Sequence, residues 1–198
     1  MNKLPKEFYL NPNVVQISKQ LLGKILFTKF NGKLTGGIIV ETEAYAGITD
    51  RASHAYNNRR TARTEIMYHE GGVGYVYLCY GVHHLFNVIT NVKDIPHAVL
   101  IRAIEPTHGI DLMLKRRKKD KMDFKLTSGP GSLSKALGIH IVHNGTNLCG
   151  DSIWIEDNLS LNKKDIIASP RVGISFAGKD AELPWRFNIK KNPWVSKC

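Results

Sequence analysis

The sequence predicts an α+β fold: a single domain with a curved sheet of mixed or antiparallel strands, a protruding β-hairpin and surrounding helices. Three observations predict it. Strand-like segments occur in pairs joined by tight turns, and the helical patterns between them are short. Hydrophobic residues make up 42% of the 198 residues, which is enough for one sizeable core. We therefore expect residues 1–198 to form one domain.

The first predicted elements are a helix and a hairpin. The helix begins after Asn13, whose side chain is suited to an N-cap, and ends at Gly23, with three apolar side chains on one face: Val14, Ile17 and Leu21. Residues 24–30 and 33–44 then form two strands. The Asn31-Gly32 pair between them supplies the positive φ that a tight hairpin turn needs.

A second hairpin and a buried strand follow. Residues 75–81 and 82–90 are expected to pair around Gly81. Residues 97–106 predict a strand that is buried on both faces and ends at Pro106, because proline cannot donate to a sheet ladder. Thr107 is then expected to cap a helix that runs to about Lys119, with three side chains facing inward: Ile110, Met113 and Leu114.

The C-terminal part predicts a short helix and closing strands. Residues 128–138 are expected to form a Gly/Pro turn and a helix, and strands are expected at WIED (154–157), RVGISF (171–176) and PWRFNI (184–189). The basic stretch Lys115–Lys121 is the only candidate linker. Because the segments on either side have too few strands for a core of their own, we expect no domain boundary there.

Charge and composition narrow the function. The chain has 28 Lys and Arg against 17 Asp and Glu, a net charge of +11, which favours a polyanionic partner, nucleic acid before a membrane surface. The alternative, that the charge only keeps a small protein in solution, is about as frequent. No apolar run approaches the roughly 20 residues of a membrane span, and the N-terminus has no apolar core of a secretion signal.

The cysteines and histidines predict neither disulfides nor a metal site. Cys79, Cys149 and Cys198 are odd in number and far apart, which fits a reduced, cytoplasmic compartment. His83 and His84 are adjacent and would point to opposite faces of a strand. We expect no metal and no cofactor.

The segment GGIIVETEAYAG (36–47) holds the main catalytic candidates. In a strand, alternation places Glu41, Glu43 and Tyr45 on one face, where the carboxylates leave an apolar run at the border of a dry interior. Such a carboxylate is costly unless it is paired or used. The alternative is a strand-end carboxylate that faces water or pairs with an arginine.

Tyrosines and one arginine add to this picture. Tyr75 and Tyr77 share a strand face, whereas Tyr80 lies at the hairpin turn, where an aromatic ring either packs or acts as a wedge between stacked bases. Arg102 is the only charge in HAVLIRAI (97–104) and needs an acidic or carbonyl partner, which by itself favours a structural role.

Together these segments resemble the alkyladenine (3-methyladenine) DNA glycosylases first known from mammals and also present in bacteria. The matching text is GGIIVETEAYAG with Ser53-His54, RRTARTEIMY, GVGYVYLCYG, Asn87, VLIRAIEP, SGPGSLSKALGI, SPRVGI and NPWVS, in one order from about residue 8 to the C-terminus. The resemblance implies a monofunctional DNA repair glycosylase that hydrolyses the N-glycosidic bond of damaged purines and leaves an abasic site. It implies catalytic roles for three residues. Glu43 would be the general base that activates a water molecule. Arg102 and the main-chain carbonyl of Val172 would hold this water.

The resemblance also assigns the residues around the extruded base. Tyr45, His54 and Tyr77 would form its walls, Tyr80 would fill the gap left in the duplex, and Asn87 would clash with the 2-amino group of normal guanine. Val82 would belong to the pocket floor, where mammalian members have a bulkier methionine.

The partner implied is double-stranded DNA with damaged purines: 3-methyladenine and 7-methylguanine, with hypoxanthine and ethenoadenine as further candidates. A monomer in the cytoplasm, at the nucleoid, is expected. Two alternatives remain at this point. One is a non-catalytic binder of damaged or kinked DNA, and the other is a hydrolase of RNA or free nucleosides.

Overall fold

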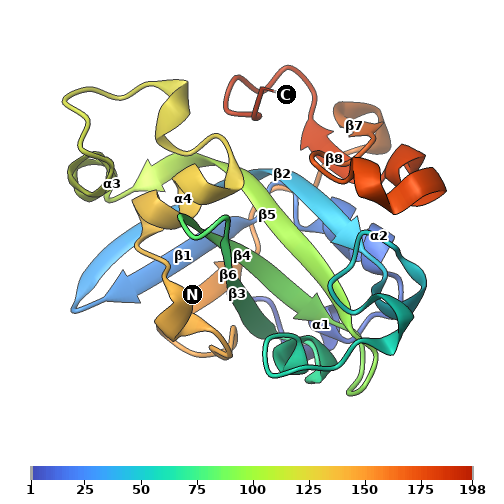
Figure 1. Cartoon of the computed structure of the whole chain (residues 1–198). Helices are drawn as coiled ribbons and strands as arrows, with labels where there is room; N and C mark the ends of the chain where they lie inside the picture. Colours follow the sequence, from blue (N-terminus) through green and yellow to red (C-terminus); the bar gives the residue numbers. More distant parts are fainter. Residues whose placement is uncertain (1, 198) are drawn as a thin grey trace.

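In the computed structural model of the chain, which describes residues 2–197, eight strands form one strongly curved sheet with helices around it (Figure 1). The strand order is β3-β4-β5-β2-β1-β6, and β8 pairs with both β2 and β7. All neighbours run antiparallel. The strands are β1 Ile25–Phe30, β2 Lys33–Tyr45, β3 Val73–Cys79, β4 His83–Thr90, β5 His97–His108, β6 Ile153–Glu156, β7 Ile166–Ser169 and β8 Arg186–Ile189. The α+β prediction and its curved sheet are confirmed.

Strand β2 organises the sheet. Along one edge its first half pairs with β1 and its second half with β8, while β5 follows its other edge. Glu43 is therefore paired on both sides, with Leu100 of β5 and Arg186 of β8. A residue in this position has a fixed backbone, because ladder hydrogen bonds hold it from two directions.

Helices cover the faces of the sheet. The α-helices are α1 Lys6–Tyr9, α2 Val14–Gln20, α3 Ile110–Arg117 and α4 Pro130–Leu137. Helix α4 packs on β4 and β5, and α2 packs on β2. The main core lies between these layers, and a smaller cluster under the β3–β4 hairpin includes Met67, Tyr68 and Tyr75. No helix in residues 2–197 has the length and apolar character of a membrane span.

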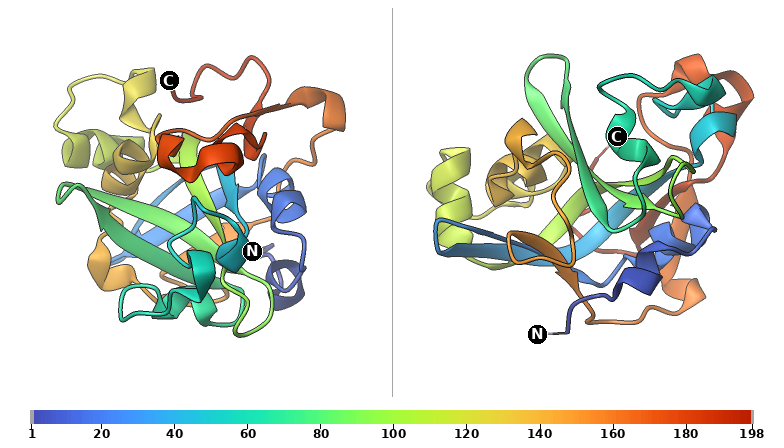
Figure 2. Two further views of the ribbon diagram at one scale, coloured as in Figure 1. Left: turned by 45° about the vertical axis from the view of Figure 1, so that its right-hand side comes forward. Right: turned by 90° about the horizontal axis from the view of Figure 1, so that it is seen from below.

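The predicted N-cap Asn13 and the turns of both hairpins are confirmed. The Asn13 side chain accepts a hydrogen bond from the backbone amide of Gln16 at 2.9 Å and caps α2. Asn31 and Gly32 have φ of 51° and 73°, which matches the mirror-image turn that fits the twist of a hairpin. In the second hairpin Tyr80 itself takes φ 51°, and the hairpin extends beyond the body of the molecule (Figure 2).

Pro106 does not end its strand, contrary to expectation, since β5 continues to His108. The proline pairs with Gly37 at a register shift, and bulges are where a sheet accepts a residue without an N–H. Thr107 consequently lies in the strand and donates its hydroxyl to the Gly36 carbonyl at 3.3 Å.

The helix after this strand therefore starts later than predicted. Gly109, in the left-handed conformation, is the N-cap of α3, and the left-handed Lys118 ends it. Met113 is fully buried as expected, and Ile110 and Leu114 pack against the core from partly buried positions.

The segment RVGISF is also not a strand. Residues 171–174 form a loop that enters a 3-10 helix, Ser175–Glu182, and the closing strand at this edge is β7, which the sequence did not suggest. The basic stretch is no linker either: Arg116 and Arg117 donate to the Ala136 and Lys125 carbonyls and join α3 to the neighbouring chain.

Candidate active site

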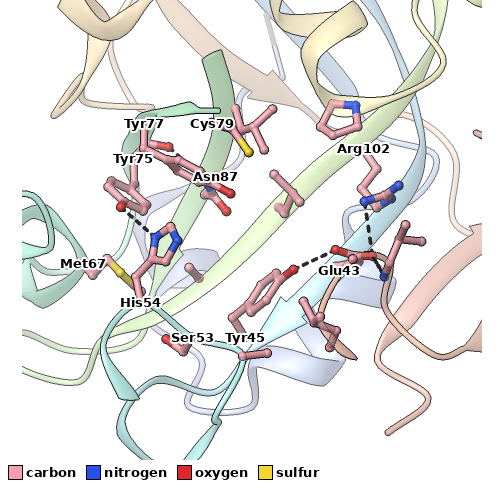
Figure 3. Close-up of a pocket in the computed structure, with 18 of the residues that line it drawn as sticks. Glu43, Tyr45, Ser53, His54, Met67, Tyr75, Tyr77, Cys79, Asn87 and Arg102 are labelled. Carbon is pink, nitrogen blue, oxygen red and sulfur yellow. Dashed lines mark hydrogen bonds and ion pairs between the residues drawn. The ribbon is translucent and has the colours of Figure 1, made fainter. Parts of the chain in front are cut away.

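A cavity of about 390 Å³ lies between the β3–β4 hairpin, strands β2 and β5 and the loop after β7. Sites for small molecules range from roughly 300 to 1,000 Å³, so this cavity is large enough for a single nucleobase. Eight of the residues selected from the sequence line it: Glu43, Tyr45, His54, Tyr77, Tyr80, Asn87, Arg102 and Val172. Figure 3 shows a polar end with Glu43 and Arg102 and, across the cavity, an aromatic end with Tyr75 and Tyr77.

Glu43 forms the polar end, where two hydrogen-bond donors and one guanidinium surround its carboxylate. The Val172 amide donates to Oε1 at 2.8 Å, Nη1 of Arg102 lies 3.3 Å from the same oxygen, and the Tyr45 hydroxyl donates to Oε2 at 2.8 Å. The side chain is buried, with 0% exposed. Burial and the neighbouring Glu43 charge raise the pKa of Tyr45 well above its usual value, so Tyr45 remains a donor at neutral pH.

Val172 contacts Glu43 through its amide; the role expected for its carbonyl stays a prediction. The loop that carries this amide is held by Arg171. Its guanidinium forms a buried ion pair with Asp50, donates to the Ala44 carbonyl at 2.8 Å and lies over the Tyr45 ring. Because these contacts fix residue 171 against strand β2, the next amide is held in reach of Glu43.

Arg102 joins Glu43 to a second buried carboxylate. Its Nε donates to Oε1 of Glu41 at 2.8 Å, and Arg186 donates to the same oxygen at 2.7 Å. Ser196, from the C-terminal segment, adds its amide at 2.8 Å and its hydroxyl at 2.9 Å. Burial opposes ionisation of Glu41, but the Arg102 charge and the Ser196 hydrogen bonds outweigh it and lower its pKa.

The predicted common face of Glu41, Glu43 and Tyr45 is thus confirmed, since Arg102 contacts both carboxylates and Tyr45 contacts Glu43. Arg102 does have acidic partners. The two carboxylates differ in their surroundings. Glu41 is held by arginines and Ser196, which is the structural alternative, whereas Glu43 lines the cavity.

Aromatic rings line the opposite end of the cavity. Tyr75 and Tyr77 stack at 5.5 Å between ring centroids, and the His54 ring meets Tyr77 edge-on at 4.6 Å. Nδ1 of His54 lies 3.0 Å from the Tyr75 hydroxyl (Figure 3). Burial raises the pKa of both tyrosines, so their hydroxyls stay neutral. These ring faces and neutral dipoles suit a flat or cationic ligand.

His54 is expected to stay uncharged across the physiological range. Burial, followed by the charges of Arg63 and Arg59, lowers the pKa of His54 to about 4 from its usual 6.5. The folded state binds a proton at His54 less tightly than the unfolded chain does. Lowering the pH below 6.5 should therefore reduce the stability of the fold, and the His54 ring should become charged only at about pH 4. An NMR titration of the His54 ring should find that midpoint.

Two variants test the cause of this shift. Arg59→Gln should raise the His54 midpoint, because one of the two repelling charges is gone. Arg60→Gln is the matched control and should leave it unchanged, because Arg60 is paired with Glu65 and Asp94. A midpoint near 6.5 in the unmodified protein would contradict the assignment.

Asn87 projects into the cavity from β4. It pairs with Tyr75 in the β3–β4 ladder and its Nδ2 donates to the Tyr75 carbonyl at 3.2 Å. The side chain is 4% exposed. It is therefore a fixed amide at the wall of the cavity, where it limits the outline of any ligand.

The two remaining predicted residues, Tyr80 and Val82, lie at the hairpin turn, and only Tyr80 lines the cavity. Tyr80 lines the rim of the cavity and is 92% exposed, so no contact in the protein explains its large ring. Val82 is 70% exposed and does not line the cavity. The expectation that Val82 forms part of the pocket floor is thus not met, because the turn directs this side chain to solvent.

Sequence reasoning missed Arg186 and Ser196 as partners of Glu41, and it missed the Asp50–Arg171 pair. No periodic signal marks Asp50, which follows the 3-10 helix Gly47–Thr49, and Arg171 belongs to a segment for which a strand was predicted. Cys79 and Cys149 are free, and Cys198 lies outside the described residues. Within residues 2–197 no three His, Cys, Asp or Glu side chains are grouped to hold a metal ion.

Comparison with known proteins identifies relatives along nearly the whole chain. The family model described as Methylpurine-DNA glycosylase (MPG) matches residues 7–193. Curated proteins named "Putative 3-methyladenine DNA glycosylase" are similar to it. The protein from Chlamydia felis is 47% identical, with 96% of this chain and 98% of the relative covered. The one from Clostridium novyi is 44% identical over the full length of both, and the one from Clostridium perfringens is 44% identical over 98% and 99%.

Proposed function

Because the chain belongs to the methylpurine-DNA glycosylase family, and is thus a DNA N-glycosylase, a hydrolase of DNA repair, we propose that it excises alkylated purines such as 3-methyladenine and 7-methylguanine from duplex DNA. The observation that carries this proposal is the cavity that places the buried Glu43 carboxylate opposite stacked tyrosines. Hypoxanthine and ethenoadenine are further candidate substrates. The whole chain, residues 1–198, acts as one glycosylase domain.

The reaction begins with extrusion of the damaged nucleotide. A purine inside a duplex offers no access to its sugar carbon, so the nucleotide rotates out at a cost of a few kcal/mol. The basic surface holds the phosphates, and the exposed ring of Tyr80 replaces the lost stacking. The extruded base enters between the rings of Tyr45, His54 and Tyr77.

The aromatic end favours damaged over normal bases. Alkylation at N3 or N7 makes the purine cationic, and ring faces attract a desolvated cation by about 1–2 kcal/mol. A neutral His54 adds no repulsion. Asn87 stands where the 2-amino group of an undamaged guanine would clash.

Glu43 provides the chemistry at the other end. A carboxylate has about four acceptor sites, and hydrogen bonds from the Val172 amide and the Tyr45 hydroxyl occupy two of them. Arg102 adds an ion pair, and a further acceptor site is left for a water. Glu43 takes a proton from this water as the water attacks the sugar carbon and the glycosidic bond breaks. Its negative charge stabilises the oxocarbenium-like transition state.

One carboxylate suffices because a cationic purine leaves without a general acid. In the part of the chain that is described, no lysine lines the cavity, which fits water as the nucleophile in place of a Schiff base. Arg102 and the Val172 carbonyl orient the water. The enzyme works as a monomer in the cytoplasm, at the nucleoid.

Base release from a panel of substrates tests the proposal. The purified protein is incubated with duplexes that carry 3-methyladenine, 7-methylguanine, hypoxanthine or ethenoadenine, and with the same lesions in a single strand and as free nucleosides. We expect abasic product from the duplexes with cationic purines. Faster turnover of nucleosides or RNA would favour a nucleoside hydrolase. No abasic product from any duplex would favour a non-catalytic binder.

Removing the ring of Tyr80 should impair extrusion more than initial binding. Base–aromatic stacking contributes about 1–3 kcal/mol, so Tyr80→Ala should lower the flipping equilibrium, read with a fluorescent base analogue, by roughly that amount. Its initial association with DNA depends on charge and should change little. Val142→Ala, which truncates another exposed apolar side chain, is the control. Equal losses in both steps would remove the wedge role.

A further inference from the structure

A second cavity, of about 290 Å³, lies directly beside the one that contains Glu43. The two cavities share five lining residues: Ala52, Ser53, His54, Arg63 and Phe176. The second cavity is completed by segment 56–64 and Arg51. The two cavities therefore adjoin along a shared wall.

Three arginines line this second cavity without a carboxylate partner. Arg51, Arg59 and Arg63 are all exposed, and none has an ion pair with the acidic side chains of residues 2–197. Asp180 is close, but it accepts from the backbone amide of Arg51, at 2.8 Å. Arg60, by contrast, does not line the cavity and forms ion pairs with Glu65 and Asp94.

The charges of two of these arginines converge on the wall between the cavities. Nη2 of Arg63 lies 3.5 Å from Nε2 of His54, and its guanidinium lies over the Tyr77 ring. Arg59 also acts on His54, since both arginines lower its pKa. Guanidiniums without a carboxylate partner around one hollow favour an anionic ligand, because their fixed planar forks match phosphate geometry.

Aromatic rings accompany the charges. Phe176, at the start of the 3-10 helix Ser175–Glu182, is 74% exposed, and Tyr56 is 40% exposed. Both line the second cavity, and Phe176 also lines the first. A basic groove with exposed rings is the combination that holds single-stranded nucleic acid, with phosphates on the charges and bases on the rings.

We propose that this second cavity is a subsite for the nucleotide next to the lesion in the same strand. Its phosphate lies against Arg51 and Arg59, and its base packs on Phe176. Arg63, at the shared wall, reaches the link between the two nucleotides. This subsite rests on the proposed function, because the lesion nucleotide must occupy the first cavity for its neighbour to reach the second.

Neutral linkages locate the phosphate. The probe is a set of duplexes with one 2′-fluoro lesion nucleotide, whose glycosidic bond resists hydrolysis, and one uncharged methylphosphonate at successive positions on either side. The unmodified protein should lose about tenfold in affinity when the neutral linkage adjoins the lesion on one side. The double variant Arg51→Ala/Arg59→Ala should bind the charged duplex more weakly than the unmodified protein. At that one linkage, neutralisation should cause the variant no further loss, while its responses at the other linkages should be unchanged.

A charge-matched control separates this site from a general basic surface. Lys163→Ala/Lys164→Ala removes two exposed charges that line neither cavity, and it should keep the full response to the neutral linkage. A double variant that weakens binding equally at every linkage, or a control that behaves like it, would overturn the subsite.

A missing base tests the aromatic half. Replacing the neighbouring nucleotide by an abasic one should weaken binding to the unmodified protein at least fivefold and leave Phe176→Ala unaffected. An equal response of both proteins would contradict the stacking role. Base release from the same duplexes without fluorine runs in parallel. Normal release without the linkage pattern overturns the subsite alone, whereas no release at all overturns the proposed function.

Discussion

Replacing Glu43 by glutamine should suppress base release by about 10²–10⁴-fold in a single-turnover assay, the contribution of a general base. Glutamine has nearly the same shape but no basic oxygen and no charge for the developing oxocarbenium ion. Binding to lesion-containing DNA should persist, because the rings and the basic surface are unchanged. Normal release by Glu43→Gln would refute the assigned role.

Tyr45→Phe is the matched control for this result. It removes one donor from Oε2 of Glu43 and keeps the carboxylate, its charge and its contacts with Val172 and Arg102. We expect a smaller loss of release than for Glu43→Gln, since the basic carboxylate is kept and only one hydrogen bond to it is lost. Losses of equal size would point to disturbed geometry and not to the missing base.

Local signals predicted the turns of this fold and failed at its long-range contacts. Asn31-Gly32 and Tyr80-Gly81 act within a few residues, so their hairpins follow from the sequence alone. The end of β5 does not. Pro106 stays in the strand only because Gly37, some seventy residues earlier, forms a bulge opposite it, and nothing near Pro106 announces that partner.

In the candidate site, too, local patterns predicted some contacts and missed those that depend on distant segments. Alternation along one strand was enough to place Glu43 and Tyr45 together. The position of Arg102 in an apolar strand predicted an acidic or carbonyl partner for it, and the partners are acidic. The Val172 amide and the Arg171–Asp50 pair were not predictable from local pattern, because they depend on how a loop near the C-terminus folds back on β2. The residue roles came from the family resemblance and stay predictions.

The contacts behind the cavity lead to the largest expected change in stability. Glu41 accepts hydrogen bonds from Arg102 and Arg186 and twice from Ser196, all in a buried position. Glu41→Ala would leave two buried guanidiniums without this carboxylate. Removing one partner of a buried ion pair costs about 3–5 kcal/mol, so urea denaturation should show a loss of that order.

Ser196→Ala separates the charge from the hydrogen bonds. It removes one hydroxyl, which donates to Glu41 and accepts from Nη2 of Arg102, and it keeps the carboxylate and the Ser196 amide contact. We therefore expect a loss of about 1.5–3 kcal/mol, smaller than that of Glu41→Ala. If this variant were as unstable as Glu41→Ala, attachment of the C-terminal segment and not charge compensation would be the main contribution of Glu41.

The pH dependence of the stability difference between the unmodified protein and Glu41→Ala tests whether the Glu41 charge is responsible. The pKa of Glu41 is lowered in the folded protein, so its ionic contribution is fully present above the usual carboxyl pKa and is lost as the pH falls through the lowered one. The stability difference between the unmodified protein and Glu41→Ala should therefore be largest near pH 7 and narrow below about pH 4. Because Arg102 also contacts Glu43, Glu41→Ala should in addition slow base release at pH 7 while DNA binding is retained. A difference in stability that stays constant with pH would show that packing, and not the carboxylate charge, accounts for the effect.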